Sequence, residues 1–182
     1  MISRKTTTDF LSKLLFKEKL TGIGKHYARE VTVDYGTGNA KRVDFMQFIP
    51  DGQCSVSALE KGIFVCYEIK SCKEDVYSGN GLNFLGEKNY IVTTLECYKE
   101  LLPDIKSGKL KRYIQENYPE SSTKFGIIGA VRGAKDGDFD GAIKADSDVN
   151  KWHLETIVKC RTGLRRKSMV ELLFCMLRAK GD

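Results

Sequence analysis

The pattern of apolar and polar residues changes most sharply over residues 62–71, GIFVCYEIKS. Residues 63–67 are β-branched, aromatic or small and apolar, which is typical of a strand buried on both faces. We therefore predict a central strand here. Glu68 and Lys70 follow at its carboxyl end, and the two-residue period of a strand places them on one face, with Ile69 on the other. We expect both charges to leave the core together.

The remaining pattern predicts four more strands and several helices. Two extended runs at 27–35 and 41–49 flank a Gly-Thr-Gly-Asn sequence that tolerates positive φ, so they form a hairpin. Further strands are predicted at residues 89–94 and 125–131. Apolar spacing predicts helices over residues 9–19, 95–102, 109–118 and, in a helical last third, from about 147 to 180, interrupted at Gly163.

This order of elements predicts one α/β (α+β) domain, built on a central mixed five-stranded sheet with helices on both faces. A chain of 182 residues is long enough for one sizeable core and short for two. We place the core at about residues 9–131 and a C-terminal helical extension at about 147–180.

Composition and short motifs limit the partners and cofactors that we expect for this protein. The net charge of +6 is compatible with a polyanionic partner, and the six cysteines form no Cys-x-x-Cys pair that would indicate zinc. No run approaches the length of a membrane span, so we expect a cytoplasmic protein with free thiols and no membrane partner. Residues 22–25, GIGK, lack the spacing of a P-loop, and no nucleotide cofactor is indicated.

Asp44 is the one carboxylate in the apolar strand at 42–49. Alone, an aspartate in such a strand is more often a hydrogen-bonded residue than a metal ligand. Most Glu-x-Lys triplets are likewise solvated strand edges. The similar triplet Asp104-Ile105-Lys106 follows a proline, and we expect it in a loop or at a helix start. Hydrolysis of a phosphodiester, however, needs two nearby carboxylates to hold a hard divalent cation and a basic group to manage the attacking water. Neighbouring strands can deliver that set.

Asp44, an interval of 23 residues and then Glu68-Ile69-Lys70 on a buried strand together resemble the PD-(D/E)xK nuclease superfamily. The hairpin before the central strand and Ser71 after the lysine are similar to the DNA-repair and phage-encoded branches of that group. The resemblance spans roughly residues 27–131. It implies a restriction-endonuclease-like fold and hydrolysis of DNA.

The resemblance also implies roles for individual residues. Asp44 and Glu68 would be metal ligands with the Ile69 carbonyl, and Lys70 would orient the water and stabilise developing charge. The cofactor would be Mg²⁺, with Mn²⁺ as a substitute. An acidic residue on the preceding strand or first helix often joins such sites, and Glu30 is the best match, with Glu18 second. A phage-encoded protein would act in the cytoplasm of its bacterial host, and a homodimer is left open.

Two features depart from the family pattern. The literal Pro50-Asp51 lies in a Pro-Asp-Gly turn, so Asp44 is the better candidate. The helix that usually follows the lysine is replaced by a glycine-rich stretch at 77–86, which we expect to be a loop. Substrate contacts could come from there or be turn residues: Asn83, Lys88 and Asn89.

Four basic residues cluster near the predicted helix break: Arg161, Arg165, Arg166 and Lys167. They either bind phosphates or form a solvated helix end, and the sequence favours neither. Residues 136–141, DGDFDG, match half of an EF-hand loop but lack its glutamate, so we interpret them as a hairpin turn. The alternative function is a catalytically inactive nuclease-fold protein that binds nucleic acid or a protein partner.

Overall fold

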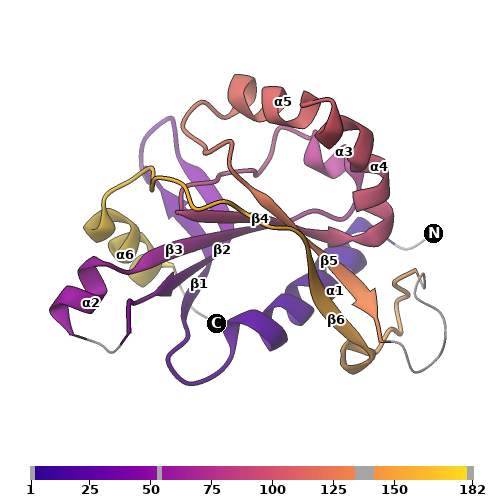
Figure 1. Ribbon diagram of the computed structural model, residues 1–182, viewed down its shortest axis with the longest axis horizontal. Coiled ribbons are helices and arrows are strands. Elements are labelled where there is room, and N and C mark those ends of the chain that lie inside the picture. The colour runs from indigo at the N-terminus through magenta and orange to yellow at the C-terminus, as the bar shows by residue number, and fades with distance from the viewer. Residues whose placement is uncertain (1–2, 53–54, 134–141, 180–182) are drawn as a thin grey trace.

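The computed structural model describes residues 3–52, 55–133 and 142–179 and is an α+β fold built on one mixed six-stranded sheet (Figure 1). The strands follow the chain order across the sheet. The β3–β4 and β4–β5 pairs are parallel and the other three are antiparallel. The strands are β1 (His26–Val33), β2 (Lys41–Ile49), β3 (Ile63–Ile69), β4 (Lys88–Thr94), β5 (Gly126–Arg132) and β6 (Trp152–Val158).

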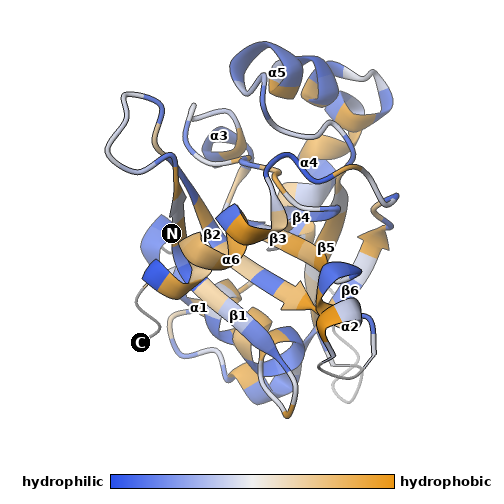
Figure 2. Cartoon of the chain, turned by 90° about the vertical axis from the view of Figure 1, so that its left-hand side faces the viewer, coloured by the Kyte–Doolittle hydropathy of each residue, from blue (hydrophilic) through white to orange (hydrophobic). Residues whose placement is uncertain are grey.

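Helices lie on both sides of the sheet, with α3, α4 and α5 together on one side and α1 on the other (Figure 1). Figure 2 shows the central strands as largely hydrophobic, whereas the outer turns of α5 are hydrophilic. The α-helices are α1 (Arg4–Leu15), α2 (Val56–Glu60), α3 (Lys73–Val76), α4 (Leu95–Lys106), α5 (Lys109–Asn117) and α6 (Met169–Arg178).

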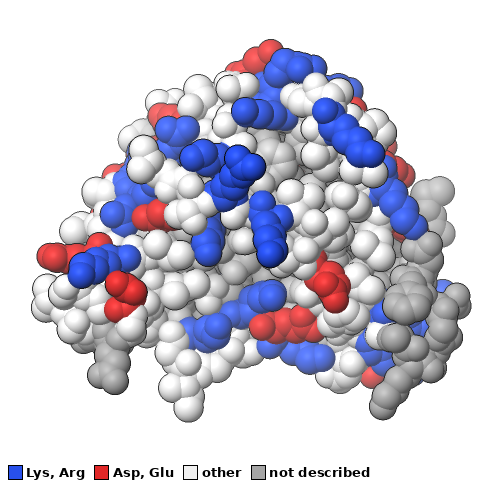
Figure 3. Space-filling view, viewed as in Figure 1, with Lys and Arg blue, Asp and Glu red and all other residues white. Residues whose placement is uncertain are grey.

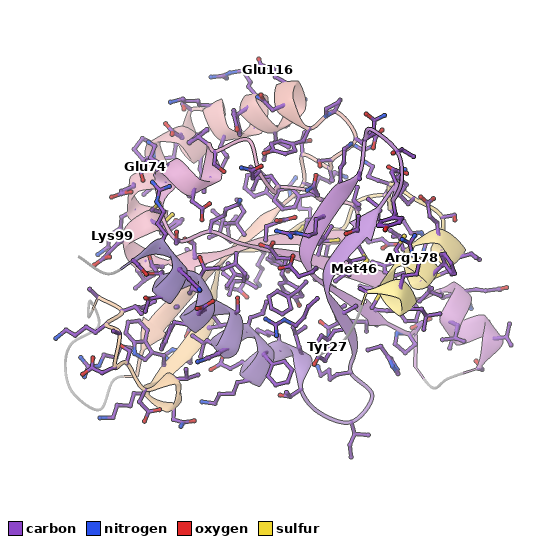
Figure 4. The ribbon with its side chains drawn as sticks, turned by 180° about the vertical axis from the view of Figure 1, so that it is seen from behind. Tyr27, Met46, Glu74, Lys99, Glu116 and Arg178 are labelled. Atoms are coloured by element: carbon purple, nitrogen blue, oxygen red, sulfur yellow. The ribbon has the colours of Figure 1, made fainter. Side chains whose placement is uncertain are left out.

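Alternation along β3 divides the core between the two faces. Tyr67 and Ile69 pack in the same cluster as the buried leucines of α1. Phe64 and Cys66 point to the opposite face, where β2 and α6 supply the neighbours, among them Met46 (Figure 4). A third cluster joins α4 and α5 to the glycine-rich loop after α3. Glu68 and Lys70 share the face of Phe64 and Cys66, as the period of a strand requires.

The prediction of a helical last third is wrong over residues 147–158. A short 3₁₀ turn, Val149–Lys151, leads into β6, so the sheet has six strands where five were expected. Trp152 and Leu154 are buried on alternate positions of β6, but the β5–β6 register shifts between Ile127 and Ile128. That irregularity disturbs the alternation, so the apolar spacing of this edge strand looks helical in the sequence.

Most other elements are confirmed, with shifted ends. The hairpin is present, and the residue 77–86 stretch is a loop. The first helix begins five residues earlier than predicted, because the Ser3 side chain accepts from the Thr6 N–H, and it continues as a π-helical turn, Phe16–Leu20. Asp104-Ile105-Lys106 ends α4; it is not in a loop or at a helix start.

Ser168 is the N-cap of α6, and its side chain accepts from the Glu171 N–H. The residues around Gly163 do not interrupt a helix, since 159–168 are outside any helix or strand.

Five cysteines in the described ranges are free thiols. None of the described helices is long and apolar enough to cross a membrane. The acidic turn expected at 136–141 lies outside the described residues.

Candidate active site

The candidate site forms at the carboxyl end of β3, where β2 and β3 part. Their main-chain pairing ends at Phe45–Tyr67. Beyond that pair, the Ile69 N–H donates to Asp44 Oδ2 at 2.8 Å, so a side-chain oxygen replaces the main-chain acceptor. The half-buried Asp44 carboxylate is thereby fixed beside Glu68, and its negative charge acts on the Glu68 carboxyl. The two predicted carboxylates are brought together.

Glu68 is completely buried, with 0% of its surface exposed. Its Oε1 accepts from the Asn83 N–H at 3.1 Å, while Oε2 has no hydrogen-bond partner in the described part of the chain. Burial, and then the charge of Asp44, raise the pKa of Glu68 well above its usual value, although Lys70 opposes this shift. Burial likewise raises the pKa of Asp44. Ionisation of both Asp44 and Glu68 is therefore unfavourable.

Lys70 lies on the same side and is also buried, with 4% of its surface exposed. The expectation that Glu68 and Lys70 leave the core is wrong, because a loop covers them. Lys70 Nζ donates to the Asn80 carbonyl at 2.6 Å. The backbone of Lys70 is held on both sides by β4, since its N–H donates to Val92 and its carbonyl accepts from Thr93 Oγ1. The backbone of Lys70 is thus fixed by β4, whereas its ammonium group is held by the loop carbonyl of Asn80.

A cleft of about 780 Å³ opens next to these residues, between α1, the β1–β2 hairpin and the glycine-rich loop. This volume is within the range of small-molecule and substrate sites in proteins. Its charged lining residues are Arg29, Glu30, Lys41, Arg42, Asp44, Lys70 and Asp75. The cationic side chains of the hairpin were not predicted as site residues, because on an isolated hairpin they are ordinary solvated positions.

Glu30 lines the cleft, and its charge acts on Asp44, but its carboxylate is paired with an arginine of the hairpin. Its Oε2 lies 2.6 Å from Arg42 Nε, and its side chain is 56% exposed. Its φ of 53° is an unusual backbone conformation for a residue in a strand. Glu18, the second candidate, is occupied elsewhere: its Oε2 accepts from the Leu154 N–H at 2.7 Å.

Among the residues suggested as substrate contacts, only Asn83 belongs to the site. Its backbone N–H binds Glu68 and its side-chain nitrogen donates to the Arg42 carbonyl at 2.8 Å. Lys88 begins β4, and the Asn89 side chain bonds the loop backbone at Gly86. Because β3 and β4 are parallel, these two lie at the other end of the strands from Glu68. Both are residues of strand β4, so the interpretation of them as turn residues is wrong.

The predicted basic cluster is spread along the sheet. Arg165 lies near the start of β3, about 20 Å from Lys70 by strand length, whereas Lys167 pairs with a residue beside the β1–β2 turn, at the same end of the sheet as Asp44 and Glu68. Arg165 is 3.3 Å from Glu87 and stacks over Phe64, at the start of β3. Arg166 donates to the Ser121 carbonyl, and Lys167 lies 2.9 Å from Asp34. Arg161 is exposed. Figure 3 shows lysines and arginines gathered over this face of the molecule. Nucleic-acid binding by these residues stays a prediction.

The chemistry available at the site is that of oxygen donors and one ammonium group. Within the described ranges, no group of three or more His, Cys, Asp and Glu side chains is arranged to hold a metal ion. Asp44 and Glu68 therefore form a two-carboxylate set, next to the main chain of Ile69. Tyr118, a buried residue at the end of α5 that the sequence did not suggest, also lines the cleft.

Comparison with protein-family models gave no match, and comparisons with curated proteins and with solved structures found no significant similarity.

Proposed function

We propose that this protein is a metal-dependent nuclease of the PD-(D/E)xK type, with a restriction-endonuclease-like fold, that hydrolyses phosphodiester bonds of DNA. One observation carries the proposal: a fully buried glutamate lies beside a second carboxylate and has one oxygen without a partner among the described residues. Burying two such groups together is unfavourable unless a cation compensates them. Their neighbour is a lysine at the end of the same strand.

The residues present fit Mg²⁺. This ion binds oxygen ligands, often through only one or two carboxylates, and keeps several waters that substrate phosphates can replace. Asp44 and Glu68 offer such a set, since Glu68 Oε2 has no hydrogen-bond partner among the described residues, and the Ile69 carbonyl is the proposed third ligand. When bound, Mg²⁺ supplies Lewis-acid polarisation of the phosphate and lowers the pKa of water.

The chain itself supplies orientation and charge. Lys70 would orient the attacking water and stabilise negative charge as it develops on the phosphate, because β4 fixes its backbone. Arg29, Lys41 and Arg42 line the cleft and would hold flanking phosphates of the substrate backbone. Specific base contacts are not required for this arrangement to hydrolyse DNA.

The alternative is a nuclease-fold protein that binds nucleic acid or a protein without cleaving. One observation favours it: Glu68 is inaccessible and Lys70 is already bonded to a main-chain carbonyl. Such a protein would use the basic surfaces alone. Its binding of DNA would then depend on cationic side chains and salt, and would be insensitive to Asp44 and Glu68.

The deciding experiment pairs calorimetric titration with Mg²⁺ or Mn²⁺ and cleavage of supercoiled and single-stranded DNA. Three proteins are compared: the wild type, Asp44→Ala/Glu68→Gln, and Asp104→Asn, which changes a carboxylate outside the site. Metal binding and cleavage that disappear only in the double variant would support the nuclease. DNA binding without metal binding or cleavage in the wild type would favour the alternative.

A further inference from the structure

The tip of the glycine-rich loop, Ser78–Gly81, lies directly over the two charged residues of the candidate site. The Asn80 carbonyl accepts from Lys70 Nζ at 2.6 Å. A Cβ atom added to Gly81 would lie 2.7 Å from Lys70 Nζ and 2.8 Å from Glu68 Oε2. The backbone of the tip therefore fills the space in front of both atoms. Residues 78–80 are themselves exposed, whereas Glu68 and Lys70 beneath them are buried.

We propose that Ser78–Gly81 is a flap that autoinhibits the site, and that the Asn80 carbonyl occupies the position at Lys70 which an anionic phosphate oxygen of the substrate takes when the flap opens. The identity of that substrate rests on the proposed function. The covered atoms are the ones the chemistry needs, since Glu68 Oε2 and Lys70 Nζ both face Gly81. In the closed arrangement Glu68 has no exposed surface and Lys70 has only 4% of its surface exposed.

The flap is held closed by a second contact on its other side. The Gly79 N–H donates to the Tyr113 hydroxyl of α5 at 3.2 Å. The ring of Tyr113 packs edge-on against Tyr77, which directly precedes the flap, with centroids 4.7 Å apart. Tyr113 is therefore a positioning residue: it touches neither Glu68 nor Lys70 in these contacts, but it fixes the loop that covers them.

The chain on the carboxyl side of the flap is anchored, so opening can be confined to the tip. Leu82, Phe84 and Leu85 are each 0% exposed. Leu82 has a φ of 62°, a left-handed conformation that a branched residue adopts only where surrounding packing enforces it. The Asn83 N–H also stays on Glu68 Oε1. Withdrawal of residues 78–81 would thus uncover Glu68 Oε2 while Oε1 keeps its bond.

Gly79 and Gly81 provide a matched pair of substitutions. Both have a φ of 80°, so alanine imposes the same backbone strain at either position. At Gly79 the new methyl group meets nothing within 4 Å, whereas at Gly81 it collides with Lys70 and Glu68. Both side chains are buried and hydrogen-bonded, whereas residues 78–80 are exposed, so we expect the flap to move in response to the clash. Gly81→Ala should therefore expel the flap from its closed position, and Gly79→Ala controls for strain alone.

The test is the rate at which an amine-reactive acetylating reagent labels Lys70, measured by peptide mass spectrometry relative to the exposed Lys111. In the wild type Lys70 should label much more slowly than Lys111. Gly81→Ala should raise the relative rate of Lys70 at least about tenfold over Gly79→Ala, because a clash in a close-packed contact shifts the population toward the open flap. Equal rates in the two variants, or fast labelling in the wild type, would overturn the flap.

Tyr113→Phe decides the matter if Gly81→Ala does not fold. This variant keeps the ring packing and removes the acceptor for Gly79, so Lys70 should label a few-fold faster than in Tyr98→Phe, a control on α4. Identical labelling of the two tyrosine variants would contradict the proposal. Labelling needs no cleavage, so a Gly81→Ala protein in which Lys70 labels fast but DNA is not cut refutes the proposed function and leaves the flap standing. Cleavage by the wild type together with equal labelling of the Gly81→Ala and Gly79→Ala proteins refutes the flap and leaves the function standing.

Discussion

Two acidic-x-lysine triplets in this chain have opposite environments. Asp104, in the triplet at the end of α4, lies 2.9 Å from Lys73 Nζ and accepts from the Tyr77 hydroxyl, also at 2.9 Å, with Lys109 nearby at 3.8 Å. Its hydrogen bonds with Lys73 and Tyr77 lower its pKa. Glu68, in the triplet at the end of β3, has a raised pKa and an oxygen with no partner among the described residues.

The contrast separates structural from functional carboxylates. Asp104 is surrounded by donors that belong to the fold, so it ties α3 and the loop after it to α4 and the start of α5. Glu68 has been placed in the core without that compensation. A group that lacks its partner in the folded chain weakens the fold, and its retention is expected where a ligand supplies the missing interaction.

The largest expected difference between the triplets is in DNA cleavage. Glu68→Gln preserves shape and removes the charge, so cleavage should fall by about 10³-fold, as when a group that holds charge in a transition state is lost. Asp104→Asn should leave the rate within about twofold at a temperature where it is folded. Initial rates on supercoiled DNA measure both. Similar losses of cleavage rate in the two variants would contradict the assignment of Glu68 as functional and Asp104 as structural.

Stabilisation by Mg²⁺ should be the next largest effect. At a concentration 100 times the Kd, binding to the folded state alone adds about 2.7 kcal/mol to the free energy of unfolding. The rise in Tm should appear in the wild type and in Asp104→Asn, and vanish in Glu68→Gln. Thermal unfolding with Mg²⁺, and with Ca²⁺ as a comparison ion, measures it. A rise that persists in Glu68→Gln would place the ion elsewhere.

The dependence of stability on pH should have opposite signs for the two triplets. Glu68 has a raised folded pKa, so the folded state binds more protons than the unfolded state above about pH 4, and its contribution to stability is lost as pH rises toward the folded pKa. Asp104 has a lowered pKa, so its contribution is present above about pH 4 and is lost as pH falls through the folded value.

In metal-free buffer, Glu68→Gln should therefore gain Tm over the wild type as pH rises from 4 to 8, by about 4 °C at the upper end. The Tm deficit of Asp104→Asn should instead shrink toward low pH. Calorimetric scans across this range give both difference curves. If the two Tm difference curves instead run parallel, other groups of the fold compensate the charge of the Glu68 carboxylate.

The smallest effect is expected at Glu30. Its ion pair with Arg42 is exposed on both sides, with 64% and 56% of the side chains accessible, and such pairs contribute about 0–1 kcal/mol. Glu30→Gln should lower cleavage less than about fivefold and leave Mg²⁺ affinity unchanged. Glu155→Gln, which removes an exposed carboxylate of β6 outside the cleft lining, is the control. A tenfold loss of Mg²⁺ affinity in Glu30→Gln alone would make Glu30 a ligand.

The sequence predicted the parts of the molecule that local patterns determine. The buried run of β3 and the glycine-rich turn of the hairpin are such patterns, and they correctly placed Asp44 and Glu68 on adjacent strands. Strand β6 was missed because its register shift against β5 breaks the alternation that identifies a strand. The sequence of one strand does not reveal an irregularity in its pairing with another strand.

The environment of the site was not predictable in the same way. Burial of Glu68 and Lys70 depends on contacts with a loop ten to fifteen residues away along the chain, whose backbone reaches them only after folding. Two charged residues at a strand end normally indicate exposure, so local reasoning predicted solvent where the fold places Gly81. The cationic residues of the cleft come from the hairpin and meet the site through sheet pairing alone.

The bond between Glu18 and the Leu154 N–H has a consequence for the molecule as a whole. β6 is the last strand of the sheet, and an open strand edge is a template onto which another chain can add by hydrogen bonding. The π-helical turn after α1 brings a carboxylate to that edge and occupies one of its donors. An acidic residue that first suggested metal binding thus occupies one of the groups through which another chain could add to the sheet.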